Sequence, residues 1–128
     1  MPYRILVTTH HITSRAKIQR LSRAAEQLAV SVLIKKTIKP YGVMVCEGDT
    51  EQHAREWLAV VKGLRYKGYR FIKGEYLTGS RLILGGKNGA RVVEGTSEFN
   101  IELDRLSAGP SNSGLKAWWA AAMRSQPA

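Results

Sequence analysis

Two adjacent histidines, His10 and His11, stand just before the helix that apolar spacing predicts over residues 14–30. The first turn of this helix carries Arg15 and Lys17 and no acidic residue. Cations there oppose the helix dipole at a cost of about 0.3–1 kcal/mol each, and a bound anion would remove that cost. This segment is therefore a candidate phosphate-contact site. Neighbours on an extended chain face opposite ways, so we expect at least one of the two histidines to be structural.

Catalytic and metal-binding patterns are sparse. Imidazole titrates near neutral pH, so His10 and His11 could act as acid and base in RNA cleavage. No Ser-His-Asp or Cys-His arrangement can be placed from spacing, and no paired carboxylates stand out. No acid lies near the histidine pair and His53 is the only other histidine, so we expect neither a metal site nor a cofactor. The single cysteine, Cys46, excludes an internal disulfide and favours a reducing compartment.

Two more groups of basic side chains lie further along the chain. Lys35, Lys36 and Lys39 precede Tyr41, whose ring could stack on a base. Lysines at a sheet edge also prevent aggregation, and both roles stay open. The third group mixes charge with rings, which suits single-stranded nucleic acid. Its members are Lys62, Arg65, Tyr66, Lys67, Tyr69, Arg70 and Lys73.

Positive charge is concentrated in the first third of the sequence. The 128 residues include 20 Lys+Arg and 10 Asp+Glu, for a net charge of +10, and residues 1–40 hold eight basic side chains against one acid. Such an excess indicates a polyanionic partner, because each neutralised phosphate releases counterions, although a solvated surface is the alternative. No stretch approaches the ~20 apolar residues of a membrane span, and no secretory signal precedes the first strand. We expect an intracellular protein, nuclear or cytoplasmic, with no membrane partner.

The predicted elements place these residues in an α+β domain. Their order, β-α-β-β-α-β, is that of a ferredoxin-like sandwich, in which two helices cover one face of a four-stranded antiparallel sheet. A capping box formed by Asp49 and Gln52 opens the second helix. The strands are expected over residues 4–9, 31–38, 42–47 and 66–72, and the helices over 14–30 and 49–63.

The remaining residues predict a C-terminal extension. The glycine-rich run 85–89 lacks the Lys-Ser/Thr ending of a P-loop and is expected to turn a β-hairpin between residues 81–84 and 90–93. Residues 99–103 alternate like a further strand, and a short helix carries Trp118 and Trp119, which we expect to pack back on the body. We therefore expect a ferredoxin-like domain with its extension over residues 1–106 (core 3–73), then a linker and tail helix over 107–128.

A series of motifs in the first half resembles a known domain. A first strand ending in His10-His11-Ile12, a basic helix, Lys39-Pro40-Tyr41-Gly42, a strand ending in Glu47-Gly48 and Leu64-Arg65-Tyr66 follow in order. Together, over residues 4–72, they resemble the C-terminal domain of the spliceosomal protein Prp3, a former domain of unknown function that also follows RWD domains. The resemblance implies a ferredoxin-like core that binds an RNA duplex with an adjoining single strand, with His10, His11, Arg15 and Lys17 near the RNA.

We accordingly expect a non-catalytic RNA-binding module for structured RNA with a duplex/single-strand junction. Two alternatives stay open: a small metal-independent ribonuclease that uses His10 and His11, and a protein-interaction adaptor that binds a partner through the Trp118/Trp119 tail. The candidate RNA-contact residues are His10, His11, Arg15, Lys17, Arg20, Lys35, Lys36, Lys39, Tyr41, Lys67 and Arg70.

Overall fold

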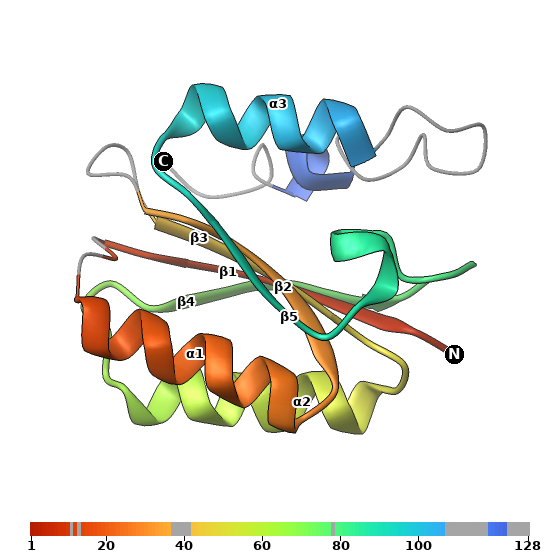
Figure 1. Cartoon of the computed structure of the whole chain (residues 1–128), viewed down its shortest axis with the longest axis horizontal. Helices are drawn as coiled ribbons and strands as arrows, with labels where there is room; N and C mark the ends of the chain where they lie inside the picture. Colours follow the sequence, from red (N-terminus) through yellow and green to blue (C-terminus); the bar gives the residue numbers. More distant parts are fainter. Residues whose placement is uncertain (11, 13, 37–41, 78, 107–117, 123–128) are drawn as a thin grey trace.

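The computed structural model describes residues 1–10, 12, 14–36, 42–77, 79–106 and 118–122. They form a five-stranded sheet with helices on both faces (Figure 1). Within these residues, no helix is long and apolar enough to cross a membrane. In chain order the elements are β1 (Tyr3–Thr9), α1 (Arg15–Gln27), β2 (Val30–Lys35), β3 (Gly42–Gly48), α2 (Glu51–Gly63), β4 (Arg70–Tyr76), the 3₁₀ turn η1 (Ile83–Gly86), β5 (Gly89–Val93) and α3 (Thr96–Leu106).

The first four strands and two helices confirm the predicted α+β, ferredoxin-like fold. β1 pairs antiparallel with β3 and β4, and β3 pairs antiparallel with β2, so the sheet order is β4-β1-β3-β2-β5. Helices α1 and α2 lie side by side on one face (Figure 1). β4 begins at Arg70 instead of Tyr66, because Gly68 turns the chain with a φ of +67° just before the strand.

Both long helices begin at a hydroxyl side chain. The Ser14 hydroxyl accepts a hydrogen bond from the main-chain nitrogen of Lys17 at 3.3 Å at the start of α1. At the start of α2, the Thr50 hydroxyl accepts one from the main-chain nitrogen of His53 at 3.1 Å. The N-cap of α2 is therefore Thr50, one residue beyond the predicted Asp49. Each cap satisfies an N–H group that has no partner within its helix.

Alternate residues of the central strands face two separate apolar cores. The helix-side core lies between the sheet and the α1–α2 layer, and the far-side core lies on the opposite face. Cys46 is fully buried in the helix-side core, and burial raises the pKa of its thiol. Large members of the helix-side core are Ile5, Ile12, Leu21, Ile34, Met44 and Trp57. Large members of the far-side core are Leu6, Leu33, Ile83, Phe99, Leu103 and Trp118.

The C-terminal extension differs from the prediction in two ways. The expected hairpin is absent from the described residues, because Ile83–Gly86 form η1 and β5 instead pairs parallel with β2, with Ala90 opposite Val32. The expected strand over 99–103 lies within α3 on the far face (Figure 1). Phe99 and Leu103 are four residues apart, so one helix face buries both of them while Ile101 remains 66% exposed.

Candidate functional site

The loop between β1 and α1 lies at one end of the sheet. The main-chain nitrogen of His10 donates to the oxygen of Lys67 at 2.9 Å, and the His10 oxygen accepts from the nitrogen of Gly42 at 2.7 Å. These two bonds hold the loop to the segment before β4 and to the start of β3. His10 is exposed, and its ring packs against Gly68, where an added Cβ would approach the ring to 2.1 Å. His11 lies outside the described residues.

The predicted cations near this loop do not converge on one point. Arg15 and Arg20 on α1 are exposed, as are Lys67 and Arg70 near β4. The ammonium group of Lys17 lies 4.8 Å from the centre of the Tyr66 ring, a cation–π distance. The structure therefore brings His10, Lys17 and Lys67 to the same end of the sheet as a loosely spaced basic surface.

The second predicted cluster is split between the interior and the surface. Lys35 is 2% exposed on the far side of β2, its ammonium group lies 5.7 Å from the centre of the Phe99 ring, and burial lowers its pKa. Lys36 is half-buried and forms an ion pair with Glu94 at 3.6 Å. Lys39 and Tyr41 lie outside the described residues. Lys35 and Lys36 therefore serve packing and local charge balance at the end of β2.

The tail tryptophans contribute to the interior of the protein. Residues 118–122 are helical, and Trp118 is 9% exposed within the far-side core. The Arg4 guanidinium lies 5.0 Å from the centre of the Trp118 ring, and Trp119 meets Phe99 edge to face at 5.3 Å. The expectation that these rings pack back on the body is confirmed. A ring buried in this way is not a surface for a partner.

One buried polar cluster that was not predicted from the sequence is centred on Glu47. One oxygen of this fully buried carboxylate accepts a hydrogen bond from Arg4 Nε at 2.8 Å and forms an ion pair with Arg4 Nη2 at 2.7 Å. Its other oxygen accepts from the main-chain nitrogens of Leu82 and Ile83, at 2.7 and 2.8 Å. A single acid within an otherwise apolar strand was the available signal, because a buried charge needs a partner.

Two buried hydroxyl groups at the loop end of the helix-side core have no hydrogen-bond partner. They are Thr9 Oγ1 and the Tyr66 phenol oxygen. Burial raises the pKa of Tyr66 to about 12. Thr9 Oγ1 and the Ile12 side chain both lie over Gly42. Among the described residues, no three metal-ligating side chains come together.

No family model and no curated protein matches the chain. Several solved structures match its fold, and they are BLUF domains, a class of flavin-based light sensors. BlrP1 of Klebsiella pneumoniae, in a manganese and cyclic diGMP complex, is 16% identical, with a TM-score of 0.65 over 96% of this chain and 33% of its own. BlrB, a BLUF protein in its dark state, is 17% identical, with a TM-score of 0.61 over 95% and 96%. A bacterial light-regulated adenylyl cyclase is 15% identical, with a TM-score of 0.57 over 100% and 37%.

These matches correct the identification made from the sequence. The resemblance to the Prp3 C-terminal domain was wrong, as was the RNA-binding module with a duplex/single-strand partner that followed from it. Neither alternative gains support. For the ribonuclease, the described residues around His10 include no second group that could form an acid–base pair with it. For the adaptor, Trp118 of the tail is buried and does not form a surface for a partner. The assignment of individual basic residues to nucleic-acid contacts stays a prediction that these matches do not test. The chain spans about a third of the length of BlrP1 and of the cyclase.

Proposed function

We propose that the chain is a regulatory domain of the BLUF type, which passes a conformational change to an effector. The observation that carries this proposal is the match along the whole chain to BLUF proteins of two kinds. BlrB is of the same length as this chain, whereas BlrP1 and the adenylyl cyclase are about three times longer. The same fold therefore occurs by itself and joined to further protein.

The central strands offer a physical route between the two faces of the domain. On β1, Val7 faces the helix-side core while the neighbouring Leu6 faces the far-side core. On β3, Met44 and Val45 divide in the same way. A displacement of α1 or α2 that shifts either strand therefore reaches α3 without passing through solvent, because closely packed cores transmit strain.

Glu47 extends this route to the C-terminal elements. Its bonds to Arg4 and to the main chain of Leu82 and Ile83 join β1, β3 and the segment before β5. Arg4 in turn stacks on Trp118 in the short helix of the far face. A shift of β1 against β3 would change the position of this helix, and an effector attached beyond it would receive the change.

The exposed cations have a role within the same proposal. Arg15 and Arg20 on α1, with Lys67 and Arg70 near β4, are exposed on a chain of net charge +10. We assign to them the recognition of an acidic surface on the effector, through contacts that steer association and weaken as salt is added.

A domain exchange tests the proposed function. The segment of the light-regulated adenylyl cyclase that this fold matches would be replaced by the present chain, and cyclase activity compared with that of the catalytic part alone. A regulatory domain should change the basal activity, and Glu47→Gln should bring it back toward that of the catalytic part. Glu51→Gln, which removes an exposed ion pair with Arg55 at 2.6 Å, is the matched control and should leave the chimera unchanged.

One result would overturn the proposal. If the folded chimera and the isolated catalytic part have the same activity, the domain has no regulatory effect on that effector. Elution volume and far-UV circular dichroism of the chimera establish that it is folded before its activity is compared.

A further inference from the structure

A flavin enclosed in this fold would have to lie in one of two cores, one on each face of the sheet. One solved structure of BlrP1 holds FMN, so the fold can occur with a flavin. FMN carries a flat ring of three fused cycles. To be enclosed, such a ring must lie between the sheet and the helices that cover one of its faces. The contents of the two cores therefore decide whether this chain can hold it.

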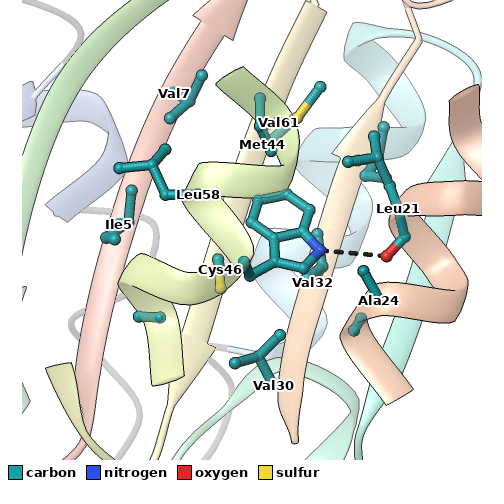
Figure 2. Packing of buried hydrophobic residues seen from close by; sticks show 14 of the residues in the cluster. Ile5, Val7, Leu21, Ala24, Val30, Val32, Met44, Cys46, Leu58 and Val61 are labelled. Carbon is teal, nitrogen blue, oxygen red and sulfur yellow. Dashed lines mark hydrogen bonds between the residues drawn. The ribbon is translucent and has the colours of Figure 1, made fainter. Parts of the chain in front are cut away.

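The helix-side space is filled by the ring of a tryptophan of this chain. Trp57 of α2 is 0% exposed and lies in the middle of the helix-side core. Its Nε1 donates to the main-chain oxygen of Leu21 on α1 at 3.1 Å (Figure 2). The indole thus spans from one helix to the other above the strands, and its single polar atom is already satisfied.

The walls of this space are chemically unsuited to a flavin. The sheet residues that face α1 and α2 include Val7, Val32, Ile34 and Met44, and each is 0% exposed. A flavin ring carries carbonyl and N–H groups along its edge, and these groups must form hydrogen bonds when they are buried. A ring placed over these apolar side chains would displace Trp57, and none of the four could form a hydrogen bond with its polar edge.

The far-side space is also filled. Phe99 and Leu103 of α3 are 0% exposed against the sheet, and Trp118 covers Arg4 beside them. On this face Arg4 and Glu47 bond each other, whereas the buried indole nitrogens of Trp118 and Trp119 have no hydrogen-bond partner. Neither core therefore has room for a flavin unless an aromatic side chain of this chain is displaced.

From this packing we infer that Trp57 takes the place of a planar ligand and that the domain works without a flavin. This inference rests on the proposed regulatory function and specifies it: the input is not flavin photochemistry. Trp57 also fixes the separation of the two helices, because it belongs to α2 and its ring is hydrogen-bonded to the main chain of α1.

Binding of FMN to the unmodified chain is the first test. The full chain would be incubated in the dark with excess FMN and separated by gel filtration, with BlrP1 as the positive control. The inference expects no flavin absorbance to elute with this chain. Stoichiometric co-elution of FMN would overturn it. Loss of that FMN in Thr9→Val or Tyr66→Phe would then place the flavin's polar edge at the two unpartnered hydroxyls.

Chemical rescue is the second test. Trp57→Ala should lower the melting temperature by about 10 °C or more, because it leaves a cavity the size of an indole. Added indole should then raise the melting temperature, since a ligand that fills the cavity binds only the folded state. Trp119→Ala is the matched control: its ring is only partly buried, so removing it leaves no enclosed cavity and indole should have no effect.

A folded Trp57→Ala variant that indole does not stabilise would overturn the assignment of Trp57 as the occupant of a ring-shaped space. If Trp57→Ala does not fold, the FMN experiment on the unmodified chain decides alone. The two proposals fail by different results. Binding of FMN would contradict this inference but not the regulatory function. A chimera with the activity of the catalytic part alone would contradict the regulatory function, whatever the result with FMN.

Discussion

Trp57 on α2 and Leu21 on α1 are joined by a buried hydrogen bond, from the indole Nε1 to the main-chain oxygen at 3.1 Å. The bond ties together two helices that are far apart in the sequence. Trp57→Phe keeps an aromatic ring but removes this donor and part of the buried surface. We expect the free energy of unfolding to fall by about 1–3 kcal/mol in urea titrations. An unchanged midpoint would show that the bond and the second ring contribute nothing.

Glu47 holds a buried ion pair, so breaking it should be costly. Glu47→Gln leaves the Arg4 charge 4% exposed without its counter-charge, and we expect a loss of about 3–5 kcal/mol. Glu51→Gln removes an exposed ion pair with Arg55 and should cost less than about 1 kcal/mol. Equal losses in the two variants, measured by urea unfolding, would contradict the central position assigned to Glu47.

Two glycines give opposite expectations for the same substitution. Gly68 has a φ of +67°, and an added Cβ would meet the His10 ring, so Gly68→Ala should destabilise the fold by at least about 1 kcal/mol. Gly63 ends α2 with no atom within 4 Å of an added Cβ, so Gly63→Ala should stabilise it by up to about 1 kcal/mol. Thermal melts of both variants check the signs, and a stabilised Gly68→Ala would refute the strained turn.

Tyr66 makes stability depend on alkaline pH. Burial raises its pKa to about 12 in the folded state, whereas an unfolded tyrosine ionises near 10. Between these values the unfolded state loses a proton that the folded state keeps, so stability should fall as pH rises from about 10 toward 12. Urea midpoints measured from pH 8 to 11.5 should fall less steeply in Tyr66→Phe than in the unmodified chain. Parallel curves would exclude Tyr66 as a source of the fall.

The first half of the fold could be predicted because its signals are local. The apolar spacing of Leu21 and Ala25 in α1, and of Ala54, Trp57 and Leu58 in α2, gives both helices. Strands β2 and β3 lie on either side of the turn predicted at residues 39–42, most of which lies outside the described residues. Parallel pairing of β5 with β2 depends instead on contacts between residues such as Ala90 and Val32, which no local pattern encodes. Phe99 and Leu103 fit a strand and a helix equally well, because positions four apart share a face in both.

The candidate site was predicted less well than the fold. Net charge indicates an anionic partner but does not distinguish RNA from an acidic protein surface. Short motifs such as His10-His11-Ile12 occupy few positions, and the main chain of His10 holds the loop that follows β1 to neighbouring segments. The residues that proved informative, Glu47 and Trp57, were read from the sequence as ordinary members of a strand and a helix. Their importance depends on partners in distant segments: Leu82, Ile83 and Leu21.

The burial of Cys46 makes its thiol a probe of how often the helix layer opens. Its thiol lies in the helix-side core with a raised pKa, so alkylating reagents cannot react with it while the helices are seated. The thiol can be modified only when α1 or α2 moves away from the sheet. When the reagent reacts faster than the layer closes, the rate of modification equals the rate of opening. Since the sequence contains one cysteine, a single mass increase reports the lifetime of the closed layer with no added label.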